Sequence, residues 1–428
     1  MTECLTISRI ALSKILKYYL DESKLPLINK LQHFNFINYG YYGGITEVYK
    51  PYGFKLIYYD VNSLYPYVAL KSMPGINCVY IESINGESLK LNELFGFFHA
   101  EIKTNNNLYL GLLPIKTKLG LIFPNGEFEG IWSSEELKFA ERNGYKIKII
   151  KGYNFNKIEG VFSNYINELY ELKSKSIGVE KAIYKSLLNN LLGRLGMNII
   201  KPITKNVTKE ELDFLTCTRK IKTFHKITEN DYLITYIPVI DEQICYDHGL
   251  DYIKVLSLDK NINLEKNIDV FKDVSIAISA MVTSYARIFM TEIKLEILKM
   301  GGNIYYSDTD SIITDTDLTI INKNLVGKEI GQFKKECLIK EGYFISNKTY
   351  CLVLEDGETI IKSKGVSDSS LTLEDFKTMY YQSKNIKGIK SHADKNYSKG
   401  YVSINEKEIE LNFDSYTKRE KIYNKNNL

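Results

Sequence analysis

Two acidic residues in nearby positions, Asp308 and Asp310, fall within the segment 303–314, where the pattern predicts two short strands joined by a hairpin connection. Such a connection would project both carboxylates from a rigid base. Asp60 follows the apolar run 54–59, so its carboxylate would emerge from the end of another strand. Hard divalent cations such as Mg²⁺ take oxygen ligands, commonly one or two carboxylates together with substrate phosphates. Three acids supplied by neighbouring strand ends would meet this need.

The same tripeptide recurs as Asp315-Thr316-Asp317, at the far end of the expected return strand. Each residue of extended chain advances ~3.3 Å, which places Asp315 about 16 Å from Asp310. One metal site cannot include both copies. We therefore interpret the second copy as a solvated strand exit.

Basic residues occur along the segment 165–195, in which Leu and Ile recur at helical spacing and Gly178 divides two helices. Lys181, Lys185 and Asn189 lie one turn apart and share a face. Such a face can hold a polyphosphate through charge-assisted bonds while the leucines pack behind it. A solvated lysine face on an amphipathic helix is the alternative, and this pattern taken alone favours it.

The remaining patterns predict the elements that would position these groups. The run 54–59, FKLIYY, indicates a strand that is buried on both faces. Residues 94–115 resemble interrupted strands, and residues 275–300 have the rhythm of a long helix that stops at Gly301. Residues 206–268 are polar and mixed, which indicates an irregular insertion.

Composition limits the class of protein. The chain has 428 residues, 44% of them hydrophobic and 25% charged, which is enough to bury a core in two or three subdomains. The net charge of +4 says little about nucleic acid. We find no apolar run long enough to span a bilayer and no secretory signal, so we expect no membrane partner. The N-terminal stretch MTECLTISRIALSKILKYYL favours a packed helix over a mitochondrial presequence. Abundant Lys, Asn, Ile and Tyr indicate an AT-rich coding genome, such as that of an organelle, a plasmid or a virus.

Five ordered motifs resemble those of family B DNA polymerases. DVNSLYP at 60–66 resembles their motif A, KSLLNNLLGRLG at 185–196 their motif B, and YSDTDS at 306–311 their motif C. YYGG at 41–44 and NKTY at 347–350 resemble the YxGG and KxY motifs of the protein-primed branch, which serves phages and linear plasmids. The resemblance extends from about residue 40 to residue 366.

The resemblance implies a metal centre that binds two Mg²⁺ ions, for which Mn²⁺ can substitute. Asp60 and Asp310 would be the main ligands, together with the backbone carbonyl of Val61. Asp308 would support the site beside them. The reaction implied is template-directed addition of dNTPs to a primer 3′-hydroxyl.

The resemblance also implies contacts with nucleotide and DNA. Tyr65 would be the steric gate that excludes a ribose 2′-hydroxyl. The incoming nucleotide would be held by the motif A and helical residues Ser63, Leu64, Tyr65, Lys173, Lys185 and Asn189. Template and primer would lie against Tyr41, Gly43, Gly44, Tyr306, Thr309, Lys348 and Tyr350.

The fold implied is an α+β right-hand polymerase, with an antiparallel palm sheet, helical fingers, a small thumb and two insertions. The expected order is an N-terminal remnant at 1–40, palm at 41–75, a first insertion at 76–165, fingers at 166–205, a second insertion at 206–268, palm at 269–365, and thumb with C-terminal tail at 366–428. The first insertion would meet a terminal protein that primes synthesis. The second would help to encircle DNA. The expected location is a mitochondrion, with a virus or a cytoplasmic plasmid as alternatives.

Two departures from the family pattern leave other functions open. Leu192 stands where motif B normally has a tyrosine, and no exonuclease motif occurs in the residues before YYGG, so we expect no proofreading by this chain. An inactive remnant of an integrated plasmid gene, which folds or binds DNA without catalysis, is one alternative. An RNA-synthesising enzyme is another, and Tyr65 disfavours it.

Overall fold

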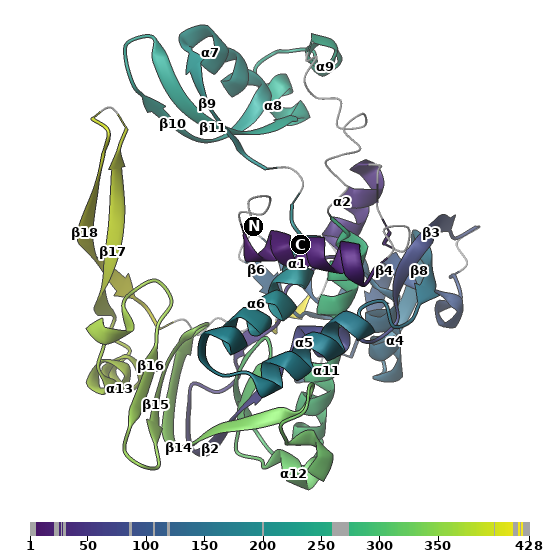
Figure 1. The fold of residues 1–428 in the computed structure, drawn as a ribbon, viewed down its shortest axis with the longest axis vertical. Helices are drawn as coiled ribbons and strands as arrows, with labels where there is room; N and C mark the ends of the chain where they lie inside the picture. Colours follow the sequence, from purple (N-terminus) through teal and green to yellow (C-terminus); the bar gives the residue numbers. More distant parts are fainter. Residues whose placement is uncertain are drawn as a thin grey trace. The chain divides into compact units, whose positions relative to one another are not determined.

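The computed structural model describes residues 6–20, 25–26, 28, 31–84, 88–105, 108–117, 120–198, 201–258, 274–397, 399–413, 418–419 and 421–422. The chain divides into two compact units (Figure 1). The first comprises Met1–Gly196, Asp273–Gly388 and Ile409–Leu428, and the second comprises Met197–Lys272 and Ile389–Glu408. Each unit is described by itself.

A seven-stranded antiparallel sheet forms the centre of the first unit, with strand order β1-β12-β13-β2-β14-β15-β16. Its strands are β1 (Thr46–Val48), β2 (Tyr52–Val61), β12 (Ile304–Asp308), β13 (Ser311–Thr314), β14 (Phe333–Ser346), β15 (Thr349–Leu354) and β16 (Thr359–Lys362). The predicted hairpin within 303–314 is confirmed as β12 and β13. Strands far apart in sequence thus meet side by side, because β13 pairs with β2.

Strand β2 has buried residues on both faces along its inner part, which confirms the expectation there, because Leu56 and Tyr59 lie three positions apart and successive side chains of a strand point to opposite faces. Leu56, Tyr59 and Val61 are buried, whereas Phe54 is 62% exposed. The expectation fails only at the start of the run, where Phe54 and Lys55 are exposed to solvent.

Helix α11 (Ile276–Lys299) confirms the predicted long helix and packs against α2 (Leu31–Tyr39), α3 (Leu64–Val68), α4 (Ser134–Arg142) and α6 (Gly178–Leu195). It ends before Gly301, whose φ of 81° suits a residue without a side chain. Within the described part of the chain, α11 alone is long and apolar enough to cross a membrane, but 89% of its most apolar window is buried inside the protein. The expectation that no segment is long enough is corrected, and the burial fits a core helix.

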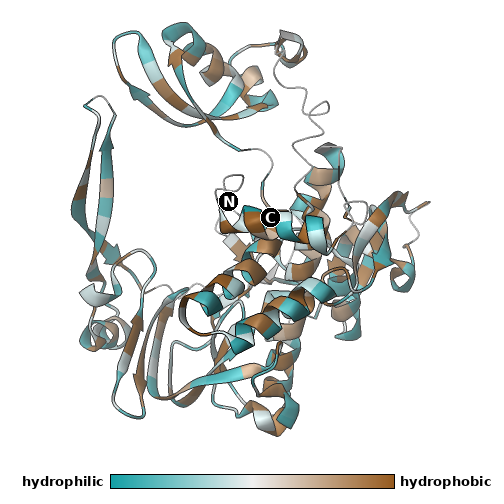
Figure 2. Ribbon diagram, viewed as in Figure 1, coloured by the Kyte–Doolittle hydropathy of each residue, from teal (hydrophilic) through white to brown (hydrophobic). Residues whose placement is uncertain are grey.

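Helices α5 (Ser163–Lys175) and α6 (Gly178–Leu195) confirm the two helices predicted around Gly178. Both carry alternating hydrophobic and hydrophilic stripes (Figure 2). Helix α1 (Ile7–Tyr18) packs against α6, which confirms a packed N-terminal helix. The hydroxyl of Tyr19 donates to Glu168 on α5 at 2.6 Å.

A second sheet in this unit has the order β19-β7-β4-β8-β3. Its strands are β3 (Met73–Glu82), β4 (Gly96–Lys103), β7 (Asn125–Ser133), β8 (Lys146–Ile158) and β19 (Lys421–Ile422), and a separate hairpin joins β5 (Ile115–Thr117) to β6 (Gly120–Ile122). Helix α4 begins at an N-cap in which the Ser133 hydroxyl accepts from the Glu136 N–H at 3.1 Å. Helix α4 packs against α11.

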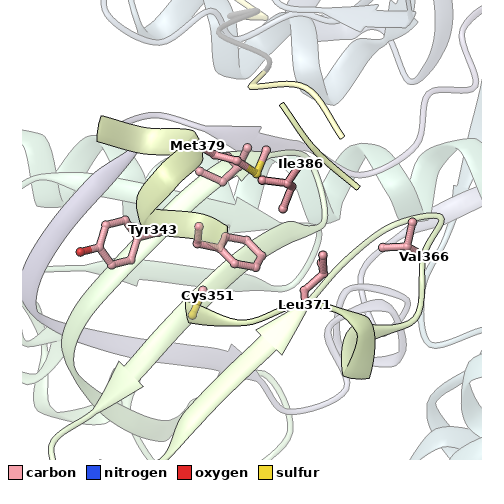
Figure 3. Packing of buried hydrophobic residues seen from close by; sticks show 8 residues of the cluster. Tyr343, Cys351, Val366, Leu371, Met379 and Ile386 are labelled. Atoms are coloured by element: carbon pink, nitrogen blue, oxygen red, sulfur yellow. The ribbon is translucent and has the colours of Figure 1, made fainter. Parts of the chain in front are cut away.

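Helix α13 (Leu373–Gln382) packs against strands β14 and β15 of the central sheet. It contributes Phe376 and Met379 to a buried cluster with Tyr343 and Cys351 of β14 and β15 (Figure 3). The helix begins at a capping box formed by Thr372 and Asp375. The chain continues into β17 (Ile386–Asn396) and β18 (Tyr401–Leu411).

The second unit is regular, so the expectation of an irregular insertion at 206–268 is wrong for the residues described. A three-stranded antiparallel sheet, β10-β11-β9, is formed by β9 (Ile203–Thr208), β10 (Arg219–Lys226) and β11 (Asp231–Ile240). Helix α7 (Lys209–Thr218) covers it with Leu212 and Leu215, and α8 (Glu242–Asp247) and α9 (Tyr252–Leu258) follow. The alternating strand pattern is masked by lysines and threonines on the exposed face.

Candidate functional site

Two carboxylates meet where strand β2 ends beside the β12–β13 hairpin. Asp60 pairs with Ser311 in the sheet register, and the Val61 N–H donates to the Asp310 carbonyl at 2.8 Å. Burial, followed by the charge of the neighbouring Asp310 carboxylate, raises the pKa of Asp60 to about 7. Burial, together with Asp308, also raises the pKa of Asp310. Two partly buried acids that repel each other form a site suited to a divalent cation.

Asp308 is bound differently from the other two acids. Its carboxylate accepts from the Lys348 ammonium at 2.6 and 2.8 Å and from the Thr46 hydroxyl at 2.8 Å. No group of three potential metal-ligating acids, histidines or cysteines occurs among the residues described. The expected meeting of three acids is therefore corrected to a pair, with Asp308 tied to a lysine beside it.

A tight turn presents Asp310. Thr309 has a left-handed φ of 57°, and its N–H donates to the Ile45 carbonyl at 2.8 Å. A Cβ at position 44 would lie 2.7 Å from Oγ1 of Thr309, so the YYGG loop must have glycine where it passes the turn. At Gly43 a Cβ would meet nothing within 4 Å. The YYGG loop and the turn that presents Asp310 are therefore in direct contact.

The second DTD has structural roles. Asp315 accepts from the backbone N–H of Asn303 at 2.7 Å, and Asp317 caps helix α12 (Leu318–Ile321) by accepting from the Thr319 N–H at 3.0 Å. That backbone hydrogen bond is the main reason why the pKa of Asp317 falls to about 2. The expectation that this copy belongs to a strand exit holds, but its side chains are bonded rather than simply solvated.

Lysines on the two long helices face the acidic pair. The Lys173 ammonium donates to the Ser63 hydroxyl at 3.0 Å, and burial followed by the charge of Lys185 lowers its pKa. Lys185 is exposed and lowers the pKa of Asp60 electrostatically. The structure thus brings together Asp60, Lys173 and Lys185, as predicted. Cations facing an acidic pair provide the arrangement that a metal-bound triphosphate needs.

The motif A turn places the expected gate. Ser63 has a φ of 56° and precedes the short helix α3, on which Leu64 is buried and Tyr65 is partly exposed. Burial raises the pKa of Tyr65 to about 12, and Asp310 and Tyr41 are among its electrostatic neighbours. Tyr65 therefore stands beside the acidic pair with a neutral hydroxyl.

The departure from motif B lies against the core. Leu192 is 6% exposed, and its carbonyl accepts from the Ser279 hydroxyl of α11 at 2.9 Å. Asn189, three residues earlier, is exposed. A Cβ at Gly196 would lie 2.6 Å from the Tyr41 hydroxyl, so Tyr41 lies directly against the end of α6.

The KxY motif is joined to motif C through a tyrosine cluster. The Lys348 N–H donates to the Tyr306 hydroxyl at 3.0 Å, and the rings of Tyr306 and Tyr350 are 5.1 Å apart. Tyr306 is only 2% exposed and stacks on Phe344. The expected contact of Tyr306 with a primer strand is corrected: its ring belongs to the core and supports Lys348.

One buried ion pair was missed from sequence. On α11, Arg287 donates to Glu136 of α4 through Nε at 2.7 Å and Nη2 at 2.8 Å, and both side chains are at most 2% exposed. Its Nη1 donates to the carbonyls of Tyr42 and Gly43. Arg287 therefore holds the YYGG loop. An arginine within the apolar rhythm of 275–300 was the signal that could have revealed it.

A further acid near the pair Asp60 and Asp310 was also missed. Glu336 occupies a register shift of β14 between the pairs that Lys335 and Cys337 make with β2. It accepts from Lys334 at 2.7 Å, and its charge raises the pKa of Asp60. A bulge of this kind re-aims a side chain towards the neighbouring strand, and sequence alone does not reveal it.

Comparison with known proteins agrees with this geometry. The structure is similar to Phi29 DNA polymerase in complex with primer-template DNA and incoming nucleotide substrates, with a TM-score of 0.69 over 96% of this chain and 68% of that chain at 16% identity. A TM-score of 0.68 is found for the same polymerase with primer-template DNA in a binary complex. This likeness shows the right-hand polymerase fold.

The sequence profile of DNA polymerase type B, organellar and viral, matches residues 1–295. A probable DNA polymerase of Podospora anserina is 52% identical over 442 residues, which cover the whole of this chain and 36% of that protein. One from Neurospora intermedia is 31% identical over 85% of this chain and 36% of that protein. The chain belongs to the organellar and viral type B DNA polymerases, and it spans about a third of the length of these relatives.

Proposed function

We propose that this chain is the polymerase core of a protein-primed type B DNA polymerase, which adds dNTPs to a primer 3′-hydroxyl on a DNA template. The observation that carries the proposal is the partly buried pair Asp60 and Asp310, faced by Lys173 and Lys185. Replication of a linear plasmid or viral DNA in a mitochondrion, primed by a terminal protein, belongs to the same proposal. The family description and the resemblance of the five motifs support it.

The residues present fit two divalent cations, because the carboxylates of Asp60 and Asp310 supply negatively charged oxygen ligands and Glu336 lies beside them. Asp60, Asp310 and the Val61 carbonyl would hold the ions. When bound, the ions supply electrostatic stabilisation of the attacking and leaving oxygens of an in-line displacement, and Mg²⁺ suits an oxygen site of this kind.

The side chains of this chain supply binding and selection. Lys173 and Lys185 neutralise the incoming triphosphate, with Ser63, Leu64 and Asn189 around the nucleotide. Tyr65 excludes the ribose 2′-hydroxyl. Lys348 and Tyr350 hold the primer end, while Tyr41, Gly43 and Gly44 hold the template. Thr309 shapes the acidic turn between them.

The decisive experiment is primer extension by the purified chain in Mg²⁺, with and without the substitution Asp310→Asn. We expect the substitution to slow extension by roughly 10³-fold, because it removes transition-state stabilisation worth several kcal/mol, and to leave DNA binding intact. Asp315→Asn is the matched control, since the second DTD lies outside the acidic pair. Extension that persists in Asp310→Asn would remove the metal-site assignment.

An inactive remnant that only folds or binds DNA is the second candidate, and the buried Leu192 in motif B is the observation that favours it. Failure of the unsubstituted chain to extend a primer, with DNA binding retained, would support this candidate. Restored extension in Leu192→Tyr would show that activity was lost at that position.

A further inference from the structure

Residues 418–419 and 421–422, here called the strap, join two parts of the first unit. Lys421 and Ile422 form strand β19, which runs parallel to β7 and pairs with Asn125 and Gly126. The carbonyl of Lys418 accepts from the Phe123 N–H at 2.7 Å. These backbone bonds fix the strap to the five-stranded sheet.

Between these anchors, Arg419 reaches the central sheet. Its Nε donates to Glu47 Oε1 at 2.9 Å, with the two side chains 16% and 3% exposed. The guanidinium also lies over the rings of Tyr49 and Tyr109, with centroids at 5.2 and 4.6 Å. A planar guanidinium between two aromatic rings is well fixed, and lysine would reproduce the charge but not the stacking.

Glu47 is itself a buried acid that needs this partner. Burial raises its pKa, whereas Arg419 and then Lys294 of α11 lower it. Lys294 is 1% exposed and donates to the Tyr49 hydroxyl at 3.2 Å. A buried carboxylate that loses a cationic partner is strongly destabilised, so Glu47 would move or take up a proton without Arg419.

Movement of Glu47 would reach the acidic turn because both belong to the same edge of the sheet. Glu47 pairs with Ser307, one residue before Asp308. The two residues that precede Glu47 contact the turn directly: Thr46 donates to Asp308, and the Ile45 carbonyl accepts from the Thr309 N–H. Strand β1 is therefore the support on which the turn rests.

We propose that Arg419 is a positioning residue of the polymerase site, which locks strand β1 and thereby fixes the turn that presents Asp310. The strap thus makes the geometry of the acidic pair depend on a segment more than a hundred positions later in the chain than the turn itself. The inference rests on the proposed function for its effect on catalysis. Its structural part stands on the contacts of Arg419, Glu47 and β1.

Single-turnover nucleotide incorporation by the full chain tests the catalytic part. We expect Arg419→Met to lower the incorporation rate by about tenfold or more, because small misplacements of reacting groups carry costs of this order. The dissociation constants for dNTP and for primed DNA should change by less than about twofold, since Arg419 lies outside the nucleotide and primer contacts. Arg419→Lys should recover part of the rate by keeping the ion pair. The exposed Arg142, substituted as Arg142→Met, is the matched control.

Hydrogen exchange measured by mass spectrometry tests the positional part without activity. In Arg419→Met, amides of 304–314 should exchange about tenfold faster, while those of 219–240 in the second unit keep their rates. Glu47→Gln should give the same pattern and replaces Arg419→Met as the test if that variant does not fold. Unchanged exchange at 304–314, or a rate loss matched by equal losses in both binding constants, would overturn the inference. A wild-type chain that extends no primer would overturn the proposed function, and the exchange result would still decide the role of Arg419.

Discussion

The buried pair of Arg287 and Glu136 offers the sharpest test of how the YYGG loop is held. The substitution Arg287→Met removes both bonds to Glu136 and the two bonds to the Tyr42 and Gly43 carbonyls, at a site where both side chains are at most 2% exposed. Breaking a buried pair by removing one partner costs about 3–5 kcal/mol, because the remaining charge stays in a low-dielectric environment. We expect a fall of this size in the free energy of unfolding.

The double substitution Arg287→Met with Glu136→Leu separates the cost of an unpaired buried charge from the loss of support for the YYGG loop. Replacing both charges by apolar groups is often neutral, so the free energy of unfolding should recover most of the loss. Affinity for primed template should be lower than that of the wild type in both the single and the double variant, because the carbonyls of Tyr42 and Gly43 lack the arginine donor in each.

Urea unfolding and fluorescence anisotropy with primed DNA measure the two quantities. Lys299→Met is the matched control on the same helix, since its pair with Glu296 is exposed and should be worth about 0–1 kcal/mol. The reasoning is refuted if the double variant is no more stable than Arg287→Met. It is also refuted if the double variant regains wild-type affinity for template.

Three further predictions concern single positions. Tyr65→Val should permit ribonucleotide incorporation, and unchanged sugar selectivity in a competition assay would refute the gate. Gly44→Ala should lower the free energy of unfolding by about 1–3 kcal/mol, because its Cβ would strike Thr309, whereas Gly43→Ala should leave it unchanged; equal losses in urea titrations would contradict the close fit. Burial lowers the pKa of Lys294 to about 8 while its unfolded value stays near 10.5, so the unfolded chain binds more protons between these values. The free energy of unfolding should therefore rise from pH 8 towards 10, by at most about 1.4 kcal/mol per pH unit, and urea titrations of Lys294→Met should lack this rise.

Periodic local patterns made much of the fold predictable. The long helix at 276–299, the two helices around Gly178 and the hairpin at 304–314 were recognisable because apolar residues recur in them at helical or strand spacing between turn residues. The acidic pair and Lys185 were found through motif spacing. In the second unit, by contrast, threonines and lysines on the exposed face concealed the alternation of β9 and β10.

Contacts between distant residues escaped sequence reasoning. Arg287 and Glu136 are 151 positions apart, and the lysine that binds Asp308 is 40 positions away. A lone arginine in an apolar helix indicates a buried partner, but the sequence does not say which residue that partner is, because the sheet register and the packing of α11 create the pairing. The burial of Tyr306 has the same origin: its ring points to the core side of β12, which only the three-dimensional sheet defines.

The pairing of β19 with β7 has a consequence for synthesis of the chain. Lys421 joins Asn125 only after about 300 further residues have been made, which at 5–20 residues per second takes roughly 15–60 s on the ribosome. Throughout that interval the edge of β7 has unpaired backbone groups and Glu47 has no guanidinium partner. The nascent chain is therefore open to mispairing at this edge for much of its translation, and codon usage or chaperones that act late in translation would influence the yield of correctly closed protein.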